Sequence, residues 1–442
     1  IVLKDQEITL DTTKFSRGGY IIEGWYNNPE GTGDKIIKVS SNIEVYAKWK
    51  EVTNIESKGS TTIGNITYSD SYEIWNKSQL LDFRNKVNNG NKFENCIIKQ
   101  KADINLNNIT WIPIGTYQNY FSGTYDGEEH TIEGININQA NFDQGLFSYV
   151  YGTENEYAEV ANLTAEGNII GTYNVGGIAG RVNYGNIKNC VNKINVKSTG
   201  HHSDEPQSAN SSSVGGIVGR IEEYGGNIEK CKNYGTIIGS YNGIGGIVGW
   251  IQKGNVIECE NHSNINNNVA MIGGISGCSG DGTNNVNIKK VKNTGEIIGN
   301  NYVGGITGYL RKNGNIEQAV NNAYISSNGC DSAYYSRTGG IIGCAGENVA
   351  VSYSYNTGNI QSNYRAIGGI IGYVYSGSIQ YCYNIGNITN KNTGSYTGRT
   401  GGIVGIKYTG RTFPVTECWQ LKNCIKSGID NEKISTTEKS ET

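Results

Sequence analysis

The sequence is poor in proline and has no long hydrophobic run. Only 4 of its 442 residues are proline, whereas 62 are glycine. Collagen requires a glycine-X-Y period and disordered linkers are usually rich in proline or serine, so this composition argues against both. No apolar stretch approaches the roughly 18 residues that a membrane-spanning helix needs. Glycine without proline, beside abundant asparagine, isoleucine and tyrosine, indicates many short strands and tight turns.

Blocks of charge of one sign and metal-binding motifs are also missing. The 37 basic and 40 acidic residues are scattered and give a net charge of −3, so we expect neither a nucleic acid nor a membrane as partner. The chain has 4 histidines and no CxxC motif, and we expect no cofactor. A serine-rich stretch makes a weak candidate metal site, although solvated side chains are the simpler interpretation; its residues are His201, His202, Asp204 and Glu205.

What the chain has in excess is one five-residue phrase, GGIxG, which occurs eight times. The spacings between neighbouring copies are 39, 30, 28, 31, 35, 29 and 33 residues. A near-period of this size predicts a solenoid, in which each strand pairs in parallel with its copy one coil later, about 4.8 Å away. The copies begin at Gly176, Gly215, Gly245, Gly273, Gly304, Gly339, Gly368 and Gly401.

Three positions of the repeat are predicted to stack from coil to coil along the solenoid. The isoleucine of the phrase should form an aliphatic column, in which each buried side chain contributes about 1.5 to 3 kcal/mol. An asparagine of the second strand should form a ladder of amide hydrogen bonds at a turn of left-handed backbone. Cys190, Cys231, Cys259 and Cys382 share a small-residue position beside it, so we expect buried free thiols rather than disulfides between coils. The ladder residues are Asn192, Asn233, Asn261, Asn293, Asn321, Asn356 and Asn384.

The strand that carries the phrase is apolar on both sides. Between its isoleucine and its last glycine stand residues such as Ala179 and Val218, which strict alternation places outside. Such a face is covered, or is an exposed patch that binds a partner or a second copy of the chain, or is a hydrophobic surface softened by glycine. Trp250, Tyr309 and Tyr373 follow the last glycine and are candidate ligand-binding residues.

Three repeats are lengthened at the same corner, in residues 198–213, 326–338 and 390–400. Loops that share a corner of a solenoid project from one edge, where binding surfaces often lie. Tolerated surface insertion is the alternative. The residues on these loops that could stack on a sugar or contact a protein are Tyr334, Tyr335, Arg337, Tyr396 and Arg399.

The flanking segments divide the chain further. We expect a small β unit in residues 1–52, a linker and first strand in 53–71, a capping helix and the first coils in 72–174, the repeats in 175–424, and a C-terminal cap or linker in 425–442. The capping helix is predicted from apolar residues at helical spacing, with Ser78 as N-cap and Gly90 as C-terminal stop. Its apolar residues are Leu80, Leu81, Phe83 and Val87.

Two stretches resemble known families. GYIIEGWY followed by NIEVYAKW resembles the Listeria-Bacteroides repeat, a β-grasp-like module of bacterial surface proteins, which implies a spacer or an adhesive bead. ADINL, WIPIGT, FSGTYDGEEHTIEGI and GLF, followed by the GGIxG phrases, resemble GLUG-motif bacterial proteins over residues 72–424. This second resemblance implies an all-β fold, a right-handed parallel β-helix. The segment TECWQLKNCIKSGI resembles the end of that family's repeats, where Cys418 and Cys424 could form a disulfide in an oxidising setting.

No sequence motif identifies a reaction. Glycoside hydrolysis needs two carboxylates facing one groove, and no pair of aspartates falls in register along the outward columns. We therefore expect a non-catalytic, extracellular, adhesin-like scaffold that presents a loop edge or an apolar face to a glycan or to a host or microbial surface protein. The alternatives are a carbohydrate-active enzyme, either a polysaccharide lyase or a hydrolase, and the targeting module of a larger surface protease. Because the sequence starts at Ile1, we expect the export signal and the anchor to lie outside this chain.

Overall fold

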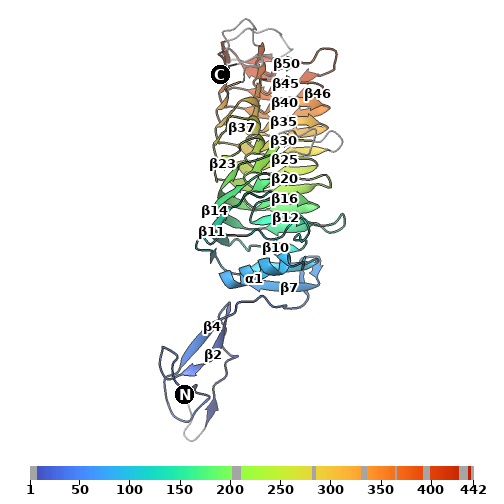
Figure 1. Ribbon diagram of the computed structural model, residues 1–442. Coiled ribbons are helices and arrows are strands. Elements are labelled where there is room, and N and C mark those ends of the chain that lie inside the picture. Colours follow the sequence, from blue (N-terminus) through green and yellow to red (C-terminus); the bar gives the residue numbers. More distant parts are fainter. Residues whose placement is uncertain are drawn as a thin grey trace.

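The computed structural model describes residues 7–201, 211–280, 285–329, 336–363, 366–391, 399–427 and 437–439. Within them, a small antiparallel unit leads into a long parallel β-helix (Figure 1). The predicted all-β solenoid with an N-terminal capping helix is confirmed. No helix in the described ranges is long and apolar enough to cross a membrane.

The N-terminal unit consists of two antiparallel strand pairs. β2 (Tyr20–Tyr26) pairs with β4 (Tyr46–Glu51), and β1 (Ile8–Thr9) pairs with β3 (Lys38–Val39). Phe15 meets Trp25 edge to face, with ring centroids 5.4 Å apart. These pairings do not test the resemblance to the Listeria-Bacteroides repeat, which stays a prediction.

The helix α1 (Lys77–Asn88) follows a short hairpin of β5 (Thr61–Ile63) and β6 (Ile66–Tyr68). The predicted N-cap, Ser78, is wrong: Asn76 caps the helix by accepting a hydrogen bond from the backbone N–H of Gln79 at 2.9 Å. Asn76 has the extended backbone that an N-cap requires, whereas Ser78 already lies within the first turn. Gly90, with φ +103°, follows the end of the helix as predicted.

The apolar face of α1 closes the first coil. Leu80, Phe83 and Val87 are fully buried, and Leu81 is partly buried against the same core. The ring of Phe83 packs edge to face on Phe121, with centroids 5.6 Å apart. The helix therefore covers the open apolar end, as expected for a solenoid cap.

Five parallel sheets build the described solenoid, and in-register pairing stacks equivalent residues of successive coils. The 12-stranded sheet contains β7 (Asp70–Ile74), β8 (Cys96–Gln100), β10 (Thr124–Asp126), β13 (Ala158–Ala161), β17 (Gly185–Lys188), β21 (Gly226–Glu229), β26 (Gly254–Ile257), β31 (Val286–Lys289), β36 (Gly314–Glu317), β41 (Val349–Ser352), β46 (Gly377–Gln380) and β51 (Val415–Thr416). The 13-stranded sheet contains β9 (Ile104–Asn105), β11 (Thr131–Asn138), β14 (Thr164–Gly171), β18 (Val191–Ser198), β22 (Lys232–Asn233), β23 (Ile237–Ile238), β27 (Glu260–Asn261), β32 (Lys292–Asn293), β37 (Val320–Asn321), β42 (Tyr355–Asn356), β47 (Tyr383–Asn384), β52 (Trp419–Leu421) and β54 (Thr437–Lys439).

The other three sheets complete each coil. The 9-stranded sheet contains β12 (Phe147–Tyr151), β16 (Ala179–Asn183), β20 (Val218–Ile221), β25 (Val248–Ile251), β30 (Ser276–Ser279), β35 (Thr307–Lys312), β40 (Ile342–Glu347), β45 (Ile371–Val374) and β50 (Val404–Lys407). The 8-stranded sheet contains β15 (Val175–Gly176), β19 (Ser211–Gly215), β24 (Asn242–Gly245), β29 (Ala270–Gly273), β34 (Asn301–Gly304), β39 (Arg337–Gly339), β44 (Ala366–Gly368) and β49 (Arg399–Gly401). The 6-stranded sheet contains β28 (Ile265–Asn266), β33 (Ile297–Gly299), β38 (Ile325–Ser327), β43 (Ile360–Ser362), β48 (Ile388–Asn390) and β53 (Ile425–Ser427).

The predicted asparagine ladder runs through the interior. From Asn192 to Asn384, each Nδ2 donates to Oδ1 of the asparagine one coil later, at 2.7 to 2.9 Å. The expected left-handed backbone at these asparagines is wrong, because they lie in strands. Positive φ occurs three residues earlier, for example at Lys230 (53°) and Glu258 (56°), where the chain turns into the 13-stranded sheet.

The second glycine of each GGIxG phrase lies against this ladder. A Cβ added to Gly246 would stand 2.4 Å from Cγ of Asn261 and 2.0 Å from the carbonyl oxygen of Gly274. Real Cβ atoms do not approach neighbours so closely. The ladder and the glycine of the phrase are therefore one packing unit.

The first and last glycines of the phrase lie where the 8-stranded and 9-stranded sheets meet. A Cβ on Gly176 would stand 2.2 Å from the carbonyl oxygen of Ala179, and one on Gly180 would stand 2.4 Å from the backbone of Asp143, one coil earlier. The two sheets thus meet backbone to backbone. We call this line, marked by Gly176, Gly180 and their equivalents, the glycine seam.

The apolar column beside the isoleucine of the phrase is buried, so of the alternatives left open for it the exposed patch is not what the structure has. Ile178 and Ala179 are both 0% exposed, as are Ile217 and Val218. The chain bends at the glycines between β15 and β16, and both consecutive side chains join the core instead of alternating. The prediction of self-association through this face rests on an exposed apolar column, and that column is buried.

The cysteines of the described residues are all free. The expected buried thiols, Cys190, Cys231, Cys259 and Cys382, are 0% exposed, and burial raises the pKa of Cys231 and Cys259 well above the ordinary value. Cys418, which the sequence suggested could pair with Cys424, is among the free thiols. The volume of this position, rather than sulfur chemistry, is what the stack uses.

Candidate binding site along the glycine seam

Two columns of side chains flank the glycine seam. The outer column, on the 9-stranded sheet, consists of Tyr149, Arg181, Arg220, Trp250, Cys278, Tyr309, Cys344, Tyr373 and Ile406. The corner column, which follows the 8-stranded sheet, consists of Asp143, Asn174, Ser213, Gly243, Met271, Tyr302, Arg337, Ala366 and Arg399. Its first six members have positive φ, between 47° and 86°.

The seam brings together two sets of residues that the sequence suggested separately. Trp250, Tyr309 and Tyr373 lie on the outer column, whereas Arg337 and Arg399 lie on the corner column. Each of the three long connections leads into the 8-stranded sheet, at β19, β39 or β49, so they share a corner as predicted. That corner is one wall of the seam.

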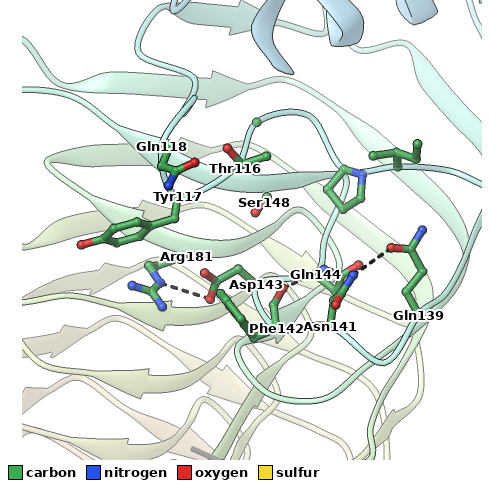
Figure 2. A pocket seen from close by; sticks show the side chains of 13 residues that line it. Thr116, Tyr117, Gln118, Gln139, Asn141, Phe142, Asp143, Gln144, Ser148 and Arg181 are labelled. Carbon is green, nitrogen blue, oxygen red and sulfur yellow. Dashed lines mark hydrogen bonds and ion pairs between the residues drawn. The ribbon is translucent and has the colours of Figure 1, made fainter. Parts of the chain in front are cut away.

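A cleft of about 660 Å³ opens near the N-terminal end of the seam (Figure 2). We call it the N-terminal cleft. Its lining is mostly neutral, with side-chain amides and exposed aromatic rings around one buried acid. The lining residues are Ile112, Pro113, Gly115, Thr116, Tyr117, Gln118, Gln139, Asn141, Phe142, Asp143, Gln144, Ser148 and Arg181.

Asp143 is the buried acid of the N-terminal cleft. Its Oδ1 accepts hydrogen bonds from Asn174 Nδ2 at 2.8 Å and from Arg181 Nε at 3.1 Å. Its Oδ2 is buried and has no hydrogen-bond partner among the described residues. Burial raises the pKa of Asp143, and the attraction of Arg181 and the bond from Asn174 offset part of that rise.

Arg181 joins Asp143 to a second carboxylate. Its Nη1 lies 3.1 Å from Oε1 of Glu222, and the Tyr149 hydroxyl donates to Oε2 of Glu222 at 3.1 Å. Arg220 Nε lies 3.7 Å from Glu222 Oε1. These partners neutralise the guanidinium of Arg181 and fix its position, so it holds Asp143 in place.

Two exposed aromatic rings stand at the N-terminal cleft. Tyr117 is 63% exposed and stacks on Tyr149, with centroids 6.0 Å apart; Phe142 is 48% exposed and stacks on Tyr173 at 5.3 Å. Figure 2 shows Tyr117 above the Arg181–Asp143 pair and Phe142 below it. Each ring is supported from one side while much of its surface remains open.

A second pocket, of about 300 Å³, opens near the other end of the seam; we call it the C-terminal pocket. Three predicted site residues, Tyr309, Arg337 and Tyr373, line it together with Cys344. The guanidinium of Arg337 lies 4.0 Å from the ring centroid of Tyr373. Burial raises the pKa of Tyr309 to about 12, so its phenol is a neutral hydrogen-bonding group.

The remaining predicted site residues are dispersed. Trp250 is only 3% exposed and lies between the guanidiniums of Arg220 and Arg311, so it is not an open ligand platform. Arg399 is exposed on β49, two coils beyond Arg337.

The candidates on the long loops are mostly outside the described residues. Those are Tyr334, Tyr335, Tyr396, His202, Asp204 and Glu205. His201 is described, and its ring packs edge to face on Tyr241 with centroids 4.3 Å apart. Within the described ranges no group of three metal-ligating side chains occurs.

Other exposed aromatics lie outside the two pockets. Tyr353 and Tyr381 are 52% and 46% exposed, but they stack on each other one coil apart, with centroids 4.9 Å apart. Tyr355, Tyr383 and Trp419 form a similar stack on the 13-stranded sheet. These rings line neither pocket and stack on their equivalents one coil away, so they stabilise the pairing between coils.

The sequence analysis missed the acidic pair, Asp143 and Glu222. They lie on different columns and meet only through Arg181, so a search along single columns for aspartates in register could not find them. The sequence does contain one signal for Asp143. If Gly145 is aligned with Gly176, Asp143 falls at the position of Asn174, which is the corner of the seam. An acid there stands opposite the arginine of the next phrase.

Comparisons with known proteins concern the repeat. The GLUG motif matches residues 171–197 and 363–389. The chain therefore contains GLUG motifs. The first GLUG match spans the seam glycines Gly176 and Gly180 and the ladder residue Asn192. No curated protein matches the chain significantly. Among solved structures, the chain is similar to a candidate immunoglobulin A1 protease from Bacteroides ovatus, with 21% identity over 57% of this chain and 76% of that one and a TM-score of 0.39.

Proposed function

We propose that this chain is a non-catalytic β-solenoid of the cell surface that binds a glycan in the N-terminal cleft. Oδ2 of Asp143 carries the proposal, because it is a buried carboxylate oxygen in a cleft, without a partner among the described residues. A buried polar group left unpaired costs about 1 to 3 kcal/mol, and more if it is charged. A ligand that donates a hydrogen bond to Oδ2 removes that cost.

A saccharide fits the other groups of the N-terminal cleft. The C–H faces of a sugar ring pack on aromatic rings, here Tyr117 and Phe142. Its hydroxyls both donate and accept, which matches the amides of Gln118 and Asn141. A neutral sugar suits this cleft, because Arg181 is already paired with two carboxylates.

A carbohydrate-active enzyme is the second candidate, because a carboxyl group with a raised pKa is the usual general acid of glycoside hydrolysis. The reaction also needs a second carboxylate at the substrate. Glu222 is held by Tyr149, Arg181 and Arg220 and does not line the N-terminal cleft. We therefore favour binding without turnover. Steady release of reducing ends from a bound oligosaccharide, abolished in Asp143→Asn, would establish the enzyme instead.

We further propose that binding takes place outside the cell, with the N-terminal unit as a spacer of the Listeria-Bacteroides type. The resemblance of that unit and the GLUG motifs support this proposal. Targeting of a larger surface protease is the alternative in which the same site serves another domain. Labelling of the full-length protein on intact cells with a membrane-impermeant reagent tests the location, and labelling only after lysis would refute it.

A glycan screen tests the binding proposal. The parent chain, Asp143→Asn and Asp126→Asn would be applied to the same set of neutral and acidic glycans and to surface proteins. Asp126 is a matched control, because it also accepts an asparagine amide, from Asn162 at 2.9 Å, but lies outside the N-terminal cleft. We expect glycan binding by the parent and by Asp126→Asn, and at least tenfold weaker binding by Asp143→Asn. Equal binding by all three, or binding to proteins alone, would refute the assignment.

A further inference from the structure

The C-terminal pocket contains an arginine whose charge has no carboxylate partner among the described residues. The guanidinium of Arg337 lies between two tyrosine rings, 5.0 Å from the centroid of Tyr302 and 4.0 Å from that of Tyr373. Its Nη1 donates to Sγ of Cys344 at 2.9 Å. Burial raises the pKa of the Cys344 thiol, against the effect of Arg337, so the thiol stays neutral and does not compensate the charge of Arg337.

Other charged side chains also stand at the C-terminal pocket. Arg311 and Glu347 also line it. Glu347 is already paired, with Lys312 at 3.1 Å and with Arg411 at 4.0 Å. Among the described residues, the carboxylate of Glu347 is therefore engaged by Lys312 and Arg411 and does not pair with Arg337.

We propose that the C-terminal pocket is a binding subsite for a carboxylate group, with Arg337 as its main donor. A guanidinium is planar and presents parallel N–H groups that match the two oxygens of a carboxylate. The rings of Tyr302 and Tyr373 hold the plane of this guanidinium, so less rotational freedom is lost on binding. The hydroxyls of Tyr309 and Tyr373 provide further donors in the same pocket.

This subsite lies on the same seam as the N-terminal cleft. Along the outer column, Arg181 and Cys344 are separated by five coils, or about 24 Å at 4.8 Å per coil. We therefore assign the carboxylate to an acidic sugar of an extended saccharide. This step rests on the proposed glycan binding, whereas the affinity of the pocket for a carboxylate does not.

Calorimetric titration with a matched ligand pair tests the proposal. The probes are an oligosaccharide of uronic acid and the same oligosaccharide after reduction of its carboxyl groups to alcohols. The proteins are the parent, Arg337→Gln, Arg337→Lys and Arg399→Gln. Arg399 is the matched control, because it occupies the same corner column two coils away and is exposed.

We expect the parent and Arg399→Gln to bind the acidic probe at least tenfold more tightly than the reduced probe. In Arg337→Gln this preference should disappear, and in Arg337→Lys it should fall to an intermediate value because the fork is lost but the charge remains. Circular dichroism and thermal melting establish that each variant is folded. A parent without preference for the acidic probe, or an unchanged preference in Arg337→Gln, would overturn the proposal.

The same titrations separate this subsite from the N-terminal cleft. Loss of binding of the reduced probe in Asp143→Asn reports on the cleft alone. If the parent binds the acidic probe but Asp143→Asn has no effect on either probe, the carboxylate subsite stands and the proposed function of the cleft fails. If Asp143→Asn weakens both probes while Arg337→Gln changes neither, the subsite fails and the cleft stands.

Discussion

The interior of the solenoid and the glycine seam are built from the same coils in the same register, yet their residues vary differently. In the interior, one residue type recurs, as in the asparagine ladder that is 0% exposed from Asn192 to Asn384. On the outer column the residue changes from Tyr149 to Arg181, and further on to Trp250 and Cys278. The ladder needs an asparagine at every step because each amide both donates and accepts, whereas the outer column holds side chains that differ in charge and shape.

Burial decides how much a repeated hydrogen bond contributes to stability. The 12-stranded sheet carries a second set of linked asparagines, in which Asn287 donates to Asn255 at 2.9 Å and Asn255 to Asn227 at 2.6 Å. This set is partly exposed, and water can replace each bond. Asparagine hydrogen bonds should therefore contribute more to stability in the buried ladder than in the partly exposed set, and variants can measure the difference.

The largest expected effect is the loss of folding when a seam or ladder glycine gains a side chain. In Gly246→Ala the new Cβ meets both the ladder residue Asn261 and the backbone of the next coil. We expect a loss of more than about 4 kcal/mol in the free energy of unfolding, measured with urea. Gly64→Ala is the control: its Cβ meets nothing within 4 Å, and only its φ of +58° is strained, at a cost of about 1 kcal/mol. Similar losses of unfolding free energy in the two variants would contradict the close packing described for the glycines of the phrase.

The next effect separates the two asparagine sets. Asn293→Ala leaves Nδ2 of Asn261 and Oδ1 of Asn321 short of a buried partner, so we expect a loss of about 2 to 4 kcal/mol in the free energy of unfolding. Asn287→Ala removes an exposed bond and should cost less than about 1 kcal/mol. Equal losses in chemical unfolding would show that burial does not distinguish the ladders.

A smaller effect concerns pH and the N-terminal cleft. Burial holds the pKa of Asp143 above its ordinary value, and a sugar hydroxyl that donates to Oδ2 favours the ionised form. Affinity for the neutral saccharide should therefore rise as the pH rises through this pKa, and fall on acidification. In Asp143→Asn that dependence should vanish, because Arg181 and Glu222 remain unchanged around it. A parallel pH profile in both proteins, measured by calorimetry, would assign the titration to another group.

The smallest effect compares two exposed tyrosines. Tyr117→Ala removes a ring of the N-terminal cleft and should weaken saccharide binding about fivefold, or roughly 1 kcal/mol. Tyr353→Ala removes a ring that is similarly exposed and also stacked, on Tyr381, but that lies outside the N-terminal cleft, and it should leave the affinity unchanged. An equal loss in the two variants would place the ligand elsewhere.

Much of the fold could be predicted from the sequence, because the interior repeats. Each of three recurring positions predicts one column of stacked residues. They are the isoleucine of the phrase, the asparagine of the ladder and the small position that cysteine often occupies. The error at Ala179 and Val218 arose because strict alternation assumes a straight strand, whereas the phrase bends between two sheets. Ser78 was misassigned for a related reason: a cap depends on where the extended backbone ends, and Asn76 fixes that point.

The candidate site could be predicted only in part. Tyr309, Arg337 and Tyr373 were identified from their positions after the last glycine and on a long connection, and the structure gathers them in the C-terminal pocket. Asp143 and Glu222 carry no repeat signal, because each occurs once at its place. Their meeting at Arg181 depends on how sharply the two sheets fold against each other at the seam, which is a property of the three-dimensional backbone.

Hydrogen–deuterium exchange of the chain with and without its saccharide tests the central claim, that binding occurs on the glycine seam. The account predicts slower exchange in residues 112–118 and 139–144, which line the N-terminal cleft, and no change in the strands of the 12-stranded sheet. Protection confined to the 12-stranded or 13-stranded sheet, with residues 112–118 and 139–144 unchanged, would contradict it.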